Sequence, residues 1–115
     1  WLDGGGRVDE DFTVAGVSGF TLLMVAASAG HERLAATLLR RGASINLHNS
    51  DGNTALLWAA DRGDERVVAT LLLRGASIDL QNSVGRTALI IAAIWDHPAV
   101  LLCLLRAGAD TELRS

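Results

Sequence analysis

The feature that most constrains the fold of this chain is a repeat of 33 residues. Five landmarks keep this step through three copies. They are the glycines Gly19, Gly52 and Gly85, the threonines Thr21, Thr54 and Thr87, the alanine pairs beginning at Ala26, Ala59 and Ala92, the leucine pairs beginning at Leu38, Leu71 and Leu104, and the Gly-Ala pairs beginning at Gly42, Gly75 and Gly108. Repeats of about 20–50 residues are typical of stacked arrays, in which each unit contacts only its neighbours.

Within each copy, the order of residues predicts two helices joined by a tight turn. A threonine precedes each apolar run, where its side-chain oxygen can accept exposed N–H groups at a helix start. The runs predict short first helices over residues 22–27, 55–60 and 88–93. Gly30 and Gly63 mark the turn before second helices, predicted over residues 31–41 and 64–74. The glycine of each Gly-Ala pair then ends the second helix, as a left-handed glycine commonly does.

The third copy departs from this pattern at its turn. Asp96 stands where the first two copies have glycine, and Pro98 falls where the second helix begins. Proline is tolerated in the first turn of a helix, because the N–H that it lacks has no partner there. We therefore expect the second helix of this copy to form.

The repeated motif resembles the ankyrin repeat family. Residues 19–27, 52–60 and 85–93 read GFTLLMVAA, GNTALLWAA and GRTALIIAA, and each copy ends in L-L-x-x-G-A. The resemblance implies an all-α ankyrin-repeat solenoid of stacked helix-turn-helix units with hairpin loops. The family usually has T-P-L-H in the first helix, but here the proline is Leu22, Ala55 or Ala88 and the histidine is Met24, Leu57 or Ile90. Apolar packing must therefore replace the hydrogen bonds of that histidine.

The length of 115 residues suits a single domain. The repeats are predicted at residues 17–49, 50–82 and 83–115. Residues 1–16 are interpreted as the tail of a preceding repeat and its loop, because Trp1–Asp9 match Leu38–Asn46 in order. The loop that follows holds four extra residues, since Gly5 and Gly19 are 14 residues apart and Gly42 and Gly52 are 10 apart. The chain is thus expected to be a piece of a longer array.

Composition excludes several classes of protein. Half of the residues are hydrophobic and 20% are charged, which excludes a disordered chain. The net charge of −3 argues against nucleic-acid binding, for which a basic excess is typical. The apolar stretch 88–105 is interrupted by Asp96-His97-Pro98, so membrane insertion, which needs about 20 consecutive apolar residues, is not expected. A single cysteine and the lack of a signal peptide favour an intracellular protein, cytoplasmic or nuclear.

The sequence predicts neither a metal site nor a cofactor. His31 and His97 occupy one repeat position two copies apart, which stacking at about 10 Å per layer separates by roughly 20 Å. Ligand bonds to zinc are only about 2 Å long, so the two rings cannot share one ion. The glycine run at residues 4–6 is not followed by the Lys-Ser/Thr pair that binds phosphate.

Catalysis is not expected either. The chain contains no G-x-S-x-G motif, and Cys103 lies in an apolar run, where we interpret it as a small buried hydrophobe. Asp61 and Asp64 could form a pair of carboxylates, but Arg62 and Arg66 lie beside them, and we interpret the group as a solvated charged face.

What remains is a binding surface. The resemblance implies a protein-binding scaffold that holds its partner in the concave groove formed by hairpin tips and first helices. Phe20 and Trp95 stand out because large aromatic residues are enriched in interface hot spots, although Trp95 could instead pack against a further repeat. The predicted partner-binding residues are Ser18, Phe20, Ser28, Asp51, Asn53, Asp61, Arg62, Arg86, Ile94 and Trp95.

Two further hypotheses stay open. The segments 90–95 and 99–105 are apolar enough for a homo-oligomer to form through the third repeat, whose outer face lacks the polar residues of a terminal repeat. Asn46 is a candidate for asparaginyl hydroxylation, because Leu38 lies eight residues before it and Ile45 directly before it, as in hydroxylated loops of the family. The competing interpretation of Asn46 is a turn residue that bonds nearby backbone.

Overall fold

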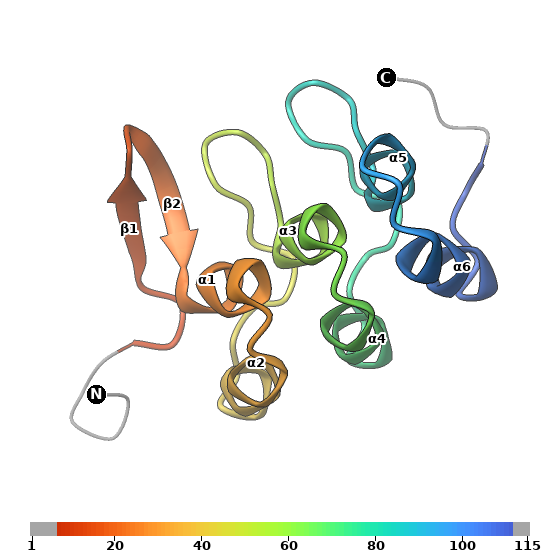
Figure 1. Cartoon of the computed structure of the whole chain (residues 1–115). Helices are drawn as coiled ribbons and strands as arrows, with labels where there is room; N and C mark the ends of the chain where they lie inside the picture. The colour runs from red at the N-terminus through yellow and green to blue at the C-terminus, as the bar shows by residue number, and fades with distance from the viewer. Residues whose placement is uncertain (1–6, 112–115) are drawn as a thin grey trace.

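The computed structural model describes residues 7–111, so the predicted match of residues 1–6 to the end of a second helix lies outside the described part. A short hairpin precedes three pairs of helices (Figure 1). The elements are β1 (Asp11–Val14), β2 (Val17–Thr21), α1 (Leu22–Ala29), α2 (Glu32–Arg40), α3 (Ala55–Arg62), α4 (Glu65–Leu73), α5 (Ala88–Ile94) and α6 (Pro98–Arg106).

The helices stack in two layers. In one layer α3 packs between α1 and α5, and in the other α4 packs between α2 and α6 (Figure 1). The loops that join successive pairs extend beyond the first layer, on its side away from the second. The molecule is elongated along the stack, measuring 44 × 28 × 19 Å. This is the helix-turn-helix repeat arrangement that the 33-residue period predicts.

Each first helix begins at the predicted threonine. The hydroxyl oxygens of Thr21, Thr54 and Thr87 accept the backbone N–H groups of Met24, Leu57 and Ile90, each at 3.3 Å. All three threonines are buried, so these bonds satisfy N–H groups that solvent does not reach. The recurring threonine therefore fixes where each repeat starts its first helix.

The helix bounds differ from the predicted ones by one or two residues. The first helices are longer than expected and run on to the turn, ending at Ala29, Arg62 and Ile94. The second helices of the first two repeats are shorter, because Arg41 and Arg74 are cap residues rather than helical ones. In the third repeat, Asp96 has φ +55° in place of the turn glycine, and Pro98 is the first residue of α6, as the sequence predicts.

The expectation of an all-α chain is corrected by the hairpin. The lengthened first loop folds into β1 and β2, which pair antiparallel with Phe12 opposite Phe20. Ala15 and Gly16 connect the strands with φ of +52° and +83°. Positive φ at two consecutive turn residues matches the right-handed twist of the strands, and this turn type is common in two-residue hairpins.

The core is continuous along the stack. The predicted alanine pairs lie at 0% exposure in the first two repeats, where the absence of a longer side chain lets neighbouring helices approach closely. The first leucine of each pair, at Leu38, Leu71 and Leu104, is also at 0% and joins the two layers. Each repeat thus completes its core with its neighbours, as a repeat array requires.

Candidate functional site

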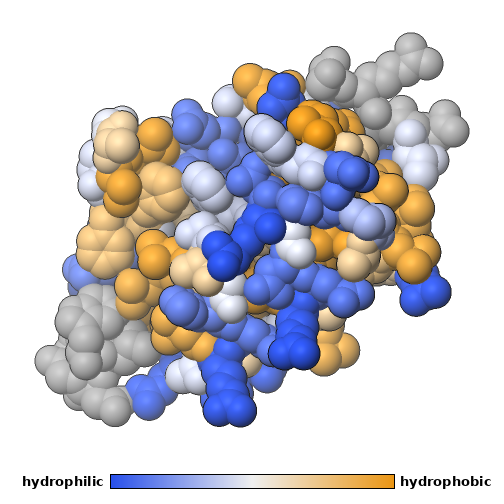
Figure 2. Space-filling view, in the orientation of Figure 1, coloured by the Kyte–Doolittle hydropathy of each residue, from blue (hydrophilic) through white to orange (hydrophobic). Residues whose placement is uncertain are grey.

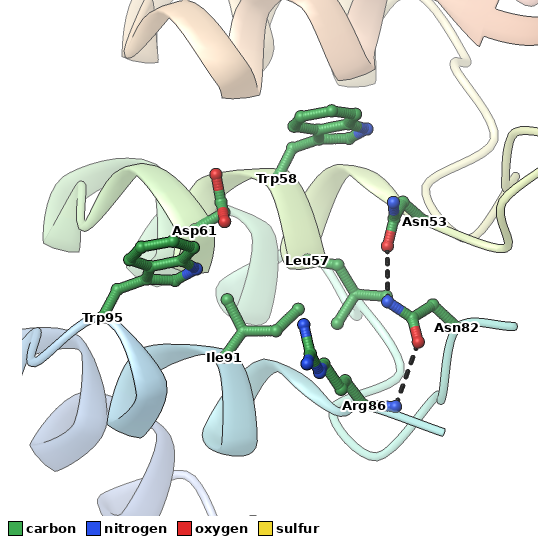
Figure 3. A pocket seen from close by; sticks show the side chains of 8 residues that line it. All are labelled: Asn53, Leu57, Trp58, Asp61, Asn82, Arg86, Ile91 and Trp95. Carbon is green, nitrogen blue, oxygen red and sulfur yellow. Dashed lines mark hydrogen bonds between the residues drawn. The ribbon is translucent and has the colours of Figure 1, made fainter. Parts of the chain in front are cut away.

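A pocket of about 190 Å³ lies between α3 and α5, beside the loops that precede them (Figure 3). Its lining includes four of the predicted binding residues, Asn53, Asp61, Arg86 and Trp95. The sequence interpretation missed the other four, Leu57, Trp58, Asn82 and Ile91. A helical period could have indicated Leu57 and Trp58, because they lie one turn before Asp61 on the same helix.

Two helices and the two loops before them position the lining. The buried cap at Thr54 starts α3, which presents Leu57, Trp58 and Asp61 to the pocket. The helix α5 and its C-cap supply Ile91 and Trp95, four residues apart and therefore on one face.

The third wall is a loop held by one asparagine. The side-chain oxygen of Asn82 accepts the backbone N–H groups of Val84 at 3.1 Å and Arg86 at 3.0 Å. Its Nδ2 donates to Oδ1 of Asn53 at 2.9 Å (Figure 3). This amide therefore ties the loop before α5 to the loop before α3, and it fixes the backbone from which the Arg86 side chain extends.

The pocket carries opposite charges at separate places. Figure 3 shows Asp61 beside Trp95, whereas Arg86 lies on the side of Asn53 and Asn82. Within residues 7–111, neither the Asp61 carboxylate nor the Arg86 guanidinium has an ion-pair or hydrogen-bond partner. Both residues are exposed, so water solvates these charges in the free protein.

Three other predicted residues meet at the junction of α1 with α3. The rings of Phe20 and Trp58 pack against each other, with centroids 5.6 Å apart and planes inclined by 38°. Nη1 of Arg62 donates to the carbonyl oxygen of Ser28 at 3.2 Å. The Nε1 atom of Trp58 is buried, with no hydrogen-bond partner among the described residues.

The remaining predicted residues lie outside the two junctions. The backbones of Ser18 and Asp51 join successive loops: the carbonyl oxygen of Ser18 accepts the N–H of Ser50, and that of Asp51 accepts the N–H of Ser83. Ile94 lies at the end of α5 and is 47% exposed. The ten predicted residues therefore do not form one cluster, because they divide between two junctions, the loops and the end of α5.

Asn46 lies in a turn, as one interpretation expected, but its side chain does not bond nearby backbone. Its side chain reaches the next repeat, where Oδ1 accepts the N–H of Ser77 and Nδ2 donates to Oγ of Ser77, both at 2.9 Å. Asp9 makes the same kind of contact with Ser44, and Asp79 does so with the N–H of Asp110. This position links consecutive repeats, and Asn46 is exposed there.

Cys103 packs against the core but is only half-buried, so it is less enclosed than its interpretation as a small buried hydrophobe implied. Burial, and to a smaller extent the negative charge of Glu65, raises the pKa of its thiol, so the less reactive protonated form is favoured. His97 lies in the turn between α5 and α6, where its Nε2 donates to the carbonyl oxygen of Asp61 at 3.0 Å. In the described range 7–111, no three His, Cys, Asp or Glu side chains are grouped so that they could hold a metal ion.

Comparison with known families matches almost the whole chain. A family model described as ankyrin repeats, with three copies, matches residues 7–82 and 23–115. No curated protein matches the chain at a significant level. None of the helices in the described part is both long and apolar enough to cross a membrane.

Proposed function

This chain belongs to the ankyrin repeat family, whose members are generally protein-binding modules, and we propose that it is a non-catalytic scaffold that holds a partner protein in a concave groove along its first helices and loops. The single observation that carries this proposal is the pocket between α3 and α5. Four residues that the family resemblance indicated, contributed by the two helix segments and the two loops before them, line this one hollow.

The chemistry of the pocket supports binding over catalysis. Its polar side chains are two amides, one carboxylate, one guanidinium and two indole N–H groups. The lining includes no thiol, hydroxyl or imidazole, the groups that most enzymes use as nucleophiles or as proton carriers near neutral pH. Tryptophan and arginine are the residue types that most often carry the binding energy of protein interfaces.

Partner capture tests the proposal. A protein captured from a lysate by the wild-type chain is identified and its affinity is measured for Arg86→Ala and Trp95→Ala. Each truncation should weaken binding by about 1–3 kcal/mol, or roughly 5- to 150-fold. The matched control is Arg33→Ala, which removes an exposed arginine from α2 in the other layer. Unchanged affinity in both pocket variants would show that the groove assignment is wrong.

Self-association is the second candidate function, and the exposure of the third repeat favours it. Ala93 is exposed although its counterpart Ala60 is at 0%, and Leu105 is 43% exposed although its counterpart Leu72 is half-buried. Figure 2 shows hydrophilic residues over the middle of the visible face and hydrophobic ones towards both ends, the α5–α6 end among them. Light scattering of the isolated chain over a dilution series tests this candidate function by itself, because binding of a different protein does not change the molar mass of the chain alone.

A further inference from the structure

The two junctions between first helices offer an internal comparison. Shifting each pocket residue back by 33 positions gives its counterpart at the junction of α1 with α3. At that first junction, Phe20 occupies the position equivalent to Asn53, and Trp58 occupies the position equivalent to Ile91. Their two large rings pack against each other. Arg62 stands for Trp95 and bonds the carbonyl oxygen of Ser28, the counterpart of Asp61. The first junction is therefore filled by the chain's own side chains.

The second junction holds smaller or differently shaped groups at the same places. The side chain of Asn53 is smaller than that of Phe20, its counterpart one repeat earlier, and it bonds to Asn82. It therefore does not fill the volume that the phenylalanine ring fills. Trp95 is 57% exposed, and its uncharged side chain cannot make the bond to a first-helix carbonyl that Arg62 makes one repeat earlier. The carbonyl oxygen of Asp61 instead accepts a hydrogen bond from His97. The space that results is the pocket of about 190 Å³.

The size of this space selects a single side chain as its occupant. Pockets for drug-sized ligands usually measure about 300–1,000 Å³, which is well above the value here. At about 30 Å³ for each water molecule, the space corresponds to roughly six waters. One long side chain of a partner protein fits this volume, and its backbone can then lie across the exposed surface.

The charge and the rings select the kind of side chain. Asp61 brings a carboxylate without a partner next to the indole of Trp95, with Trp58 on the same helix as Asp61 (Figure 3). A guanidinium can stack flat on an indole and pair with a carboxylate through two parallel hydrogen bonds. On the Trp95 side of the pocket, an acidic side chain would instead meet the Asp61 charge, and a purely apolar one would leave that carboxylate without a partner in the complex.

We propose that the pocket between α3 and α5 binds an arginine side chain of the partner, with the guanidinium between Asp61 and Trp95. This inference rests on the proposed function and names the chemistry that the groove recognises. The cation of Arg62 is held on the first junction by Ser28, and Arg86 lies on the far side of the pocket. Arg86 is thus placed to meet an acidic or carbonyl group of the same partner segment.

Short peptides test the proposal directly. The probe is an acetylated and amidated pentapeptide with arginine at its centre and glycine and serine around it. Its titration is followed by NMR through the indole N–H signal of Trp95, which reports weak binding at the site itself. The matched probes replace arginine by citrulline, which keeps the shape without the charge, and by glutamate. The arginine peptide should bind at least tenfold more tightly than either.

Two variants identify the carboxylate. Asp61→Asn should weaken the arginine peptide about tenfold, which is the order expected for loss of a charge-assisted hydrogen bond. Because the Asp61 carboxylate has no partner in the free chain, this variant should fold normally, and circular dichroism checks that it does. Glu10→Gln removes the same charge from the exposed loop before β1 and should leave the affinity unchanged.

The outcomes separate this inference from the proposed function. Equal binding of the arginine and citrulline peptides, tighter binding of the glutamate peptide, or full affinity in Asp61→Asn would each overturn the arginine site. The groove proposal would survive these results if a captured partner still depended on Trp95 and Arg86. Conversely, tenfold selectivity for arginine that disappears in Asp61→Asn would support the site by itself.

Discussion

At the scale of single residues, equivalent positions in different repeats show what one substitution changes. Asn49 and Asn82 are equivalent, and in both the side-chain oxygen accepts two backbone N–H groups of the loop. Nδ2 of Asn82 donates to Asn53, but Nδ2 of Asn49 is buried without a partner among the described residues. The reason is that Phe20, which has no acceptor in its side chain, stands where the next repeat has Asn53.

This comparison predicts the effect of removing Asn53. Asn53→Ala should lower the free energy of unfolding by about 1 kcal/mol, because it leaves Nδ2 of Asn82 without its acceptor in a half-buried site. Urea denaturation measures the change. Ser83→Ala is the control in the adjacent loop, since its side chain is exposed, and it should change stability by less than about 0.5 kcal/mol. An equal effect of the two substitutions would contradict this account of the loop.

At the scale of elements, the turn inside one repeat contacts the turn of the next. A Cβ atom added at Gly63 would lie only 2.5–2.8 Å from three atoms of the His97 imidazole. That ring in turn bonds the carbonyl oxygen of Asp61 at the end of α3. In the preceding junction, Gly30 faces Arg62 and Asp64 in the same way. Glycine is therefore suited to this turn for two reasons: its backbone adopts a positive φ, and its lack of a Cβ lets a side chain of the next repeat approach closely.

Two glycine substitutions separate these roles. Gly63 and Gly75 have φ of +83° and +94°, so alanine at either site costs roughly 1–2 kcal/mol through backbone strain. Nothing lies within 4 Å of a Cβ at Gly75, whereas at Gly63 the His97 ring must move and lose its bond to Asp61. Gly63→Ala should therefore destabilise the chain by about 1 kcal/mol more than Gly75→Ala in urea denaturation. Equal losses would mean that the His97 contact adds no stability.

At the scale of the whole molecule, the sequence predicted the fold far better than the site. The 33-residue period fixed the helix pairs, their threonine caps and their glycine ends, because these depend on local residues that recur. The strands β1 and β2 were missed because the first loop holds four residues more than its counterparts, so no other copy indicates its conformation. The family resemblance also indicated Asp61 and Trp95. The pocket, however, depends on how large the opposing side chains are, and no single repeat carries that information.

The two ends of the stack expose apolar groups that the middle buries. On the first repeat, Leu34 is 44% exposed, while its counterparts Val67 and Val100 are at 0%. On the third repeat, Leu101 is half-buried and its counterpart Val68 is at 0%. Each end thus presents the face that, in the middle, packs against a neighbouring repeat, and apolar patches of this kind mark contact sites on soluble proteins.

A charged residue on the α6 face tests whether this exposure drives association. The wild-type chain should gain molar mass with concentration in light scattering, because covering the third repeat removes apolar surface from water at about 25 cal/mol for each Å². Leu105→Arg should suppress that gain, since it places a charge on the uncovered face. Leu73→Arg is the matched exchange at the end of α4, where the leucine is 86% exposed but the neighbouring repeat already covers the end face. This control should associate like the wild type. A wild-type mass that stays monomeric at high concentration would show that the third repeat does not bind a second copy.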